Sequence, residues 1–123
     1  MKKVDVTKLS VDELVERYAA ISVAQYQAED NDNISKYNRL VDDLIAAQAE
    51  LKSRAGDQRI ALMKLYDHPN MQVRLNAAHA TLGVAPEAAR ALLLAIRESR
   101  WMPQAMQAGM SLRNLENGVY RPD

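Results

Sequence analysis

The chain has 123 residues, enough for one hydrophobic core and too few for two large ones. Hydrophobic residues make up 48% and charged residues 26%, as in globular rather than disordered proteins. Sixteen basic residues balance sixteen acidic ones, so no overall field attracts nucleic acid or an anionic membrane, and neither is expected as a partner.

The composition predicts an all-α protein. Alanine and leucine are abundant, phenylalanine is absent, and the four glycines and four prolines stand far apart. The absence of cysteine excludes a disulfide, a thiolate nucleophile and a zinc–thiolate site. The N-terminus lacks the apolar run of a signal peptide, and the longest apolar run, residues 91–96, is too short to cross a bilayer. A cytoplasmic location is therefore expected.

The first predicted helix follows a loose lead-in at residues 1–9. Ser10 and Glu13 form a capping-box pair, in which each side chain can satisfy the other residue's free backbone N–H. Apolar residues then recur at helical spacing to about Ala28. Residues 29–33 break this pattern and supply the next N-cap.

The second and third predicted helices meet at a glycine. A long helix starts at Ile34, and Gly56 closes it in a left-handed conformation. Asp57 caps a third helix that runs through Tyr66, and residues 68–70 then turn the chain.

The last three predicted helices are bounded by glycine and proline. The fourth ends at Gly83. Pro86 starts a fifth helix that runs through Ser99, and Pro103 starts the sixth. The tail at residues 117–123 is expected to be irregular.

Six helices joined by short turns predict three antiparallel hairpins stacked in order, within a single domain covering residues 1–123. An internal repeat supports this prediction. A shift of thirty positions matches small with small and large with large residues, namely Ala61 with Ala91, Leu62 with Leu92, Ala78 with Ala108 and Leu82 with Leu112.

One stretch carries a family resemblance. Residues 67–78, read together with Leu82, resemble the HEAT and armadillo-like pattern of Asp, Pro, Val-Arg, Ala-Ala and Leu. The whole chain is similar to a small bacterial family of HEAT-like domains, DUF2019. The resemblance implies an α-α superhelix (HEAT/ARM-like), and it implies no reaction.

Candidate binding residues come from the helical wheel of the fourth helix. Apolar residues cover most of its circumference, and Gln72, Asn76 and His79 gather into one polar stripe, which is the predicted open face of a groove. Arg74 falls inside the apolar arc, where a charge must be paired. By resemblance to HEAT repeats, Arg74 is expected to hold the turn through Asp67 or a carboxylate of the preceding layer.

On the last helix, the thirty-residue shift places Met102 and Met106 on the groove side. Two interpretations remain open. The favoured one is that the tail covers this face as core, and the other is an adaptable apolar surface for a protein partner. Trp101 is expected to be a core residue, and Gln104 to lie on the polar side of a terminal helix.

No catalytic constellation is recognised. His68 and His79 have no partner at metal-ligand spacing, so no catalytic residue, metal or cofactor is predicted. The leading hypothesis is a non-enzymatic module that binds a protein partner. The alternative is a homodimer formed through the long N-terminal helical pair. A HEAT-like enzyme or nucleic-acid-binding protein is disfavoured by zero net charge and an aromatic content of 5%.

Overall fold

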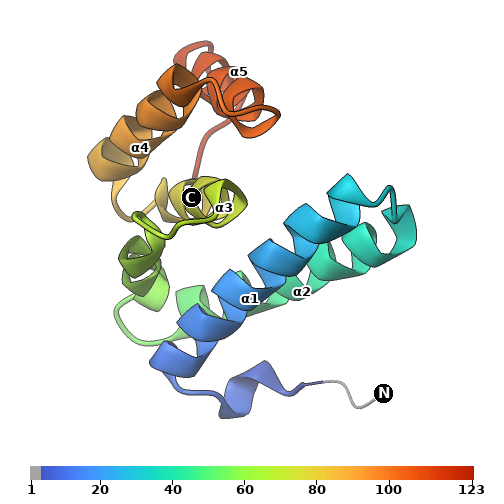
Figure 1. Ribbon diagram of the computed structural model, residues 1–123. Helices are drawn as coiled ribbons and strands as arrows, with labels where there is room; N and C mark the ends of the chain where they lie inside the picture. The colour runs from blue at the N-terminus through green and yellow to red at the C-terminus, as the bar shows by residue number, and fades with distance from the viewer. Residues whose placement is uncertain (1–3) are drawn as a thin grey trace. The chain divides into compact units, whose positions relative to one another are not determined.

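The computed structural model describes residues 4–123, and in this range the chain is helical and contains no strand (Figure 1). The helices, in chain order, are η1 (Val6–Lys8, 3-10), α1 (Val11–Asp30), α2 (Ile34–Ser53), η2 (Gln58–Leu65, 3-10), α3 (Met71–Thr81), α4 (Pro86–Ser99) and α5 (Gln104–Glu116). The all-α prediction is confirmed. The six predicted helices correspond to α1, α2, η2, α3, α4 and α5.

Local signals set most of these boundaries. The Ser10 hydroxyl accepts a hydrogen bond from the Glu13 N–H, and the Glu13 carboxylate accepts one from the Ser10 N–H, which completes the capping box. Gly56 has a φ of 79°, the left-handed conformation predicted after the second helix. Pro86 is the first residue of α4, where its missing N–H costs no hydrogen bond.

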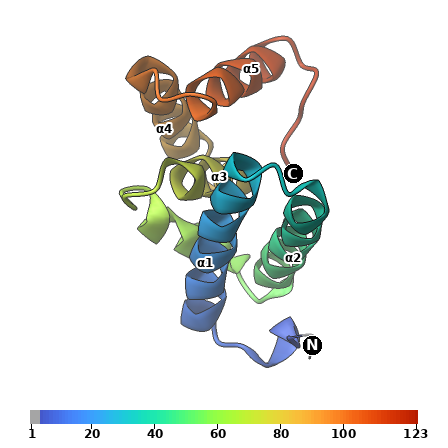
Figure 2. The same cartoon turned by 45° about the vertical axis from the view of Figure 1, so that its right-hand side comes forward.

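The chain divides into two compact units, Met1–Ala61 and Leu62–Asp123, with the division inside η2. In the first unit, α1 and α2 form an antiparallel hairpin and η1 packs on α2 (Figure 2). The Arg54 guanidinium donates to the carbonyl oxygens of Val6 at 3.3 Å and Leu9 at 2.6 Å. The described part of the lead-in is therefore fastened to the end of α2, and the prediction of a loose segment is wrong for residues 6–9. Residues 1–3 lie outside the described part.

In the second unit, α4 packs against both α3 and α5. The core of this unit combines large aliphatic side chains with alanines: Leu75, Ala78, Leu82, Ala89, Leu93, Ile96, Ala108 and Leu115. Alanine permits close approach of helix axes, and the leucines fill the space between them. Ala78 and Ala108, paired by the internal repeat, are both fully buried.

Two finer predictions concern the second helical hairpin and the number of domains. The second predicted hairpin would pair residues 57–66 with the fourth helix, but η2 is a 3-10 helix and α3 packs mainly on α4. The Tyr66 hydroxyl, in the turn that follows η2, hydrogen-bonds the Thr81 hydroxyl of α3 at 2.5 Å. The prediction that all of the chain forms a single domain stays a prediction.

Candidate interaction surface on α5

Two faces of α5 have opposite character. Gln104, Ala105, Ala108 and Leu115 are buried. On the other side, Met102, Met106 and Met110 are exposed by 63%, 57% and 55%, and Trp101 by 56%. We call these four residues the methionine surface.

Helical geometry places two of the four side chains, Met106 and Met110, on one face of α5. Residues four apart in an α-helix lie one above the other. The Ala105 N–H donates to the Trp101 carbonyl at 2.8 Å, so the helical turn begins before α5 itself. Met106 and Met110 therefore form one stripe on α5, while Trp101 and Met102 lie in the turn just before it, ahead of a cis peptide bond between Met102 and Pro103.

The methionine surface is held in place by the packing of α5 on α4. A Cβ atom added to Gly109 would lie 3.4 Å from the Arg97 Cδ, so the glycine allows the Arg97 stem to lie directly against the helix. Gly109 thus allows a close approach of α4 to this helix. Met110, one residue further, completes the exposed stripe, and its i,i+4 spacing from Met106 was the signal for it.

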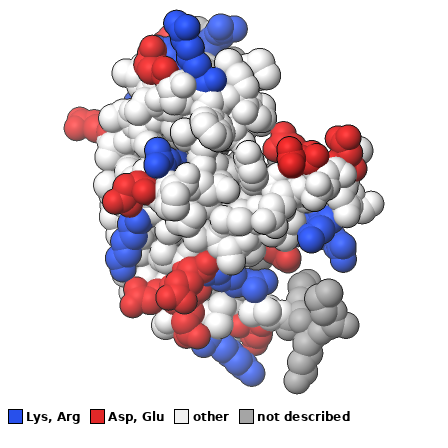
Figure 3. Space-filling model, viewed as in Figure 1, with Lys and Arg blue, Asp and Glu red and all other residues white. Residues whose placement is uncertain are grey.

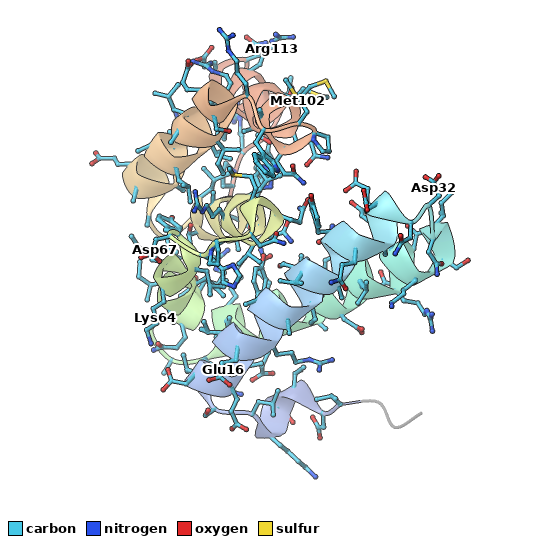
Figure 4. All side chains as sticks on the ribbon, in the orientation of Figure 1. Glu16, Asp32, Lys64, Asp67, Met102 and Arg113 are labelled. Atoms are coloured by element: carbon cyan, nitrogen blue, oxygen red, sulfur yellow. The ribbon has the colours of Figure 1, made fainter. Side chains whose placement is uncertain are left out.

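The charged side chains within residues 99–115 are basic, and Glu98 and Glu116 lie just outside this segment. Residues 99–115 contain two charged side chains, Arg100 and Arg113, and no aspartate or glutamate. Both arginines are exposed, and neither forms an ion pair with a described residue. Figure 4 labels Met102 and Arg113 in this unit, and Figure 3 shows basic side chains beside a broad uncharged face there.

The tail does not cover the methionine surface. The Tyr120 N–H donates to the Asn114 carbonyl at 3.2 Å, but the side chains of Val119 and Tyr120 are exposed. The favoured interpretation, in which the tail makes this face part of the core, is therefore wrong. The prediction that Trp101 is a core residue is wrong as well. Large apolar side chains satisfy the same helical pattern in a core or on an exposed face, so their spacing alone did not distinguish the two.

The polar stripe on α3, which was predicted to be open to solvent, is largely buried. Gln72 and Asn76 are only 4% and 7% exposed. The Gln72 Nε2 donates to the Asn76 Oδ1 at 2.9 Å, and the Gln104 Nε2 donates to the Gln72 Oε1 at 3.1 Å. The stripe faces α5 and is not open. These two amides therefore lack the accessibility on which their predicted partner-binding role depended, and Gln104 is an interior residue.

His79 belongs to the same contact between α3 and α5. Its Nε2 lies 2.7 Å from the Ser111 hydroxyl oxygen. Burial lowers the pKa of the His79 imidazole below its ordinary value, because the charged form loses its hydration. The neutral ring is thus a structural hydrogen-bonding group and not the solvated groove residue that was expected.

Arg74 holds the turn before α3, but through a different atom from the one predicted. Its Nε donates to the His68 carbonyl oxygen. Asp67 is exposed and forms no ion pair with Arg74 or any other described residue. The backbone carbonyl thus replaces the predicted carboxylate.

The first unit contains a concave region, which is lined mainly by residues of α1 and α2. It is an open hollow of about 570 Å³, and the residues that line it include Leu9, Glu16, Arg17, Ile21 and Asp43. The Arg17 Nε is buried without a hydrogen-bond partner. Carboxylates and one arginine share this hollow with apolar side chains, so its charge does not select one class of ligand.

Neither region contains a recognisable catalytic or metal-binding constellation. Across residues 4–123, no group of three or more His, Asp or Glu side chains is arranged to hold a metal ion. In the same range, no helix combines the length and the apolar character needed to cross a membrane. The chemistry that the methionine surface offers is apolar contact with basic flanks.

Comparison with known proteins places the chain in a family. The chain is similar to the protein RPA1889 from Rhodopseudomonas palustris CGA009, whose crystal structure is known. The two sequences are 45% identical, and the alignment covers 98% of this chain and 100% of RPA1889. The two structures superpose with a TM-score of 0.96. No curated protein matches the chain. The family described as "Domain of unknown function (DUF2019)" matches residues 12–116. The chain therefore belongs to the DUF2019 family.

Proposed function

We propose that this protein is a non-enzymatic interaction module that binds a protein partner through the methionine surface. One observation carries the proposal, namely that Met106 and Met110 are exposed on one face of α5 and that Trp101 and Met102, in the turn just before it, are exposed as well. Contiguous exposed apolar patches mark interaction sites in soluble proteins. Single exposed apolar residues would carry no such meaning.

The residue types favour a protein partner. Methionine is flexible and polarisable, so it adapts to irregular apolar surfaces. Tryptophan, methionine and arginine are enriched in protein interfaces, and tryptophan and arginine dominate their energetic hot spots. Arg100 and Arg113 flank the apolar stripe, which gives an apolar centre with a polar rim.

A HEAT-like superhelix and a cytoplasmic location are parts of this proposal. The Asp-Pro-Val-Arg-Ala-Ala run and the almost complete burial of α3 support the repeat assignment, since a helix inside a stack is enclosed by its neighbours. A stacked helical architecture would present α5 as an end face. The terminal faces of such stacks are ordinarily polar because they contact water. An apolar terminal face therefore supports the presence of a binding partner.

Quantitative affinity capture tests the proposal. The tagged full chain and its Met106→Ser/Met110→Ser variant would be used as baits in lysate of the native cell, with bound proteins measured by mass spectrometry. We expect at least one protein to be retained by the wild type and reduced about tenfold with the variant, whose stability should change little because both side chains are exposed. Ile45→Ser, at a similarly exposed apolar residue of α2, is the matched control. Equal retention by all three baits would remove the methionine surface as the binding site.

The homodimer through the N-terminal helical pair is retained as a second proposal. Leu44 and Leu51 of α2 are buried, so they are used within the chain. Ile34 and Ile45, however, are exposed and lie eleven residues apart, which places them on one face of α2. Sedimentation equilibrium at about millimolar concentration tests this idea. A monomer there would end it.

A further inference from the structure

We propose that the methionine surface receives an acidic amphipathic helix of the partner protein. This inference rests on the proposed function and specifies the partner's chemistry. The observations that carry it are the helical spacing of the apolar side chains, the saturation of the α5 backbone, and the basic character of the charges within residues 99–115.

The backbone of α5 restricts how a partner can bind. Its N–H and C=O groups are used within the helix, and the described residues contain no strand. A peptide therefore cannot add to the edge of a sheet, which is the usual way for an extended segment to gain main-chain hydrogen bonds. Side-chain packing must supply the contact, and a partner helix satisfies its own backbone while it packs.

The geometry of the stripe suits a helix. Met106 and Met110 are separated by a rise of about 6 Å along the α5 axis, one turn apart. A second helix presents apolar residues at the same interval, so its ridges can pack between the methionines. Trp101 extends the apolar area at one end and supplies a large contact of low conformational freedom.

The charges select an acidic partner. Arg100 precedes Trp101, and Arg113 lies one turn beyond Met110, so in the sequence an arginine stands at each end of this segment. Glu98 is paired with Arg97 at 3.0 Å, and Glu116 lies a further turn beyond Arg113. No carboxylate lies within the stripe itself. Aspartate or glutamate at both ends of a docked helix would find unpaired arginines.

The same charges oppose a second copy of this chain as the occupant. In a two-fold dimer through the methionine surface, Arg100 and Arg113 of one copy would approach the same two arginines of the other. Like charges at an interface cost binding energy and suppress the wrong partner. The acidic helix avoids this repulsion.

A display selection tests the inference. The full-length protein would be panned against a library of helical peptides about five turns long, with leucine at a heptad-like set of positions and an equal choice of glutamate or lysine elsewhere. We expect the enriched peptides to keep the leucine stripe and to show a strong excess of glutamate. Their affinity should fall about tenfold for Met106→Ser/Met110→Ser, about tenfold for Arg100→Glu/Arg113→Glu, and in high salt. Arg39→Glu, at an exposed arginine of α2, is the matched charge control and should have no effect.

The possible failures are distinguishable. Enriched peptides that depend on the methionines but show no glutamate excess, or that lack helical spacing, would overturn the acidic helix and leave the proposed function standing. Peptides unaffected by the methionine variant, or no enrichment at all, would count against the methionine surface itself. A concentration-dependent dimer abolished by Met106→Ser/Met110→Ser would replace the acidic helix with a second copy of the chain.

Discussion

Gln104 at the start of α5 donates a hydrogen bond from its Nε2 to the Oε1 of Gln72 on α3, at 3.1 Å and out of contact with solvent. Gln72 in turn donates to Asn76, so three amides form a buried chain between the two helices. The Gln104 Oε1 is itself buried without a hydrogen-bond partner among the described residues. An amide chain of this kind positions α5 on α3 and, by doing so, orients the methionine surface outward.

Gln72→Ala should destabilise the protein by about 1–3 kcal/mol, since it leaves the Gln104 amide N–H unpaired in the interior. Urea unfolding measures the change. The control is Gln107→Ala, at a less buried glutamine of α5, and it should cost less than about 0.5 kcal/mol. In a double-mutant cycle, Gln72→Ala and Gln104→Ala should be non-additive, because they remove the same bond. Additive effects would contradict the pairing.

Leu93→Ala should cost about 2–5 kcal/mol, because Leu93 is fully buried in the core of the second unit and its truncation leaves a cavity. The adjacent Leu94 is exposed, and Leu94→Ala should stay within about 0.5 kcal/mol of the wild type. Thermal or urea unfolding of the two variants side by side measures the contrast. Similar losses for both would show that α4 is rotated from the orientation described here.

His79 should make stability depend on pH. Its pKa is lowered in the folded protein below the ordinary value of 6.5, so between the two values the unfolded chain binds the extra proton and the folded chain does not. Stability should therefore be fully present above about pH 6.5 and decline as the pH falls toward the folded pKa.

The His79→Gln variant isolates this effect, because glutamine can hydrogen-bond Ser111 without titrating. The free energy of unfolding, measured at several values between about pH 5 and pH 7.5, should fall more steeply for the wild type than for the variant. The difference removes the contribution of the carboxylates, which both proteins share. Parallel curves would mean that folding does not lower the pKa of His79.

Arg54→Ala should release the lead-in segment from α2, since the Arg54 guanidinium binds the carbonyls of Val6 and Leu9. Limited trypsin digestion should then cut faster after Lys8, with mass spectrometry as the measurement. Glu50→Gln is the control. It removes the 2.7 Å ion pair with Arg54, which is partly buried, but leaves the bonds from Arg54 to the lead-in. Unchanged cleavage in Arg54→Ala would show that other contacts hold the segment.

Local chemistry was sufficient to predict the α-helices, although it missed η1. The capping box at Ser10, the left-handed Gly56 and the first-turn Pro86 each act within a few residues, so their effects can be read along the chain. The apolar arc of the fourth helix was also correct, because helical periodicity reports which side chains need burial.

Tertiary structure decided the accessibility of the candidate site. Gln72 and Asn76 were read as solvent-exposed because amides are usually found at the surface, yet an amide is stable in the interior when another amide meets it. Here that partner, Gln104, lies 32 residues from Gln72. Trp101 and Met106 were read as core because apolar side chains gain free energy by burial, but burial requires a covering element, and the tail leaves them exposed. The sequence by itself thus determined where the helices begin and end and which need neighbours. Which polar groups found partners, and which apolar groups were left without cover, depended on contacts between residues far apart in the chain.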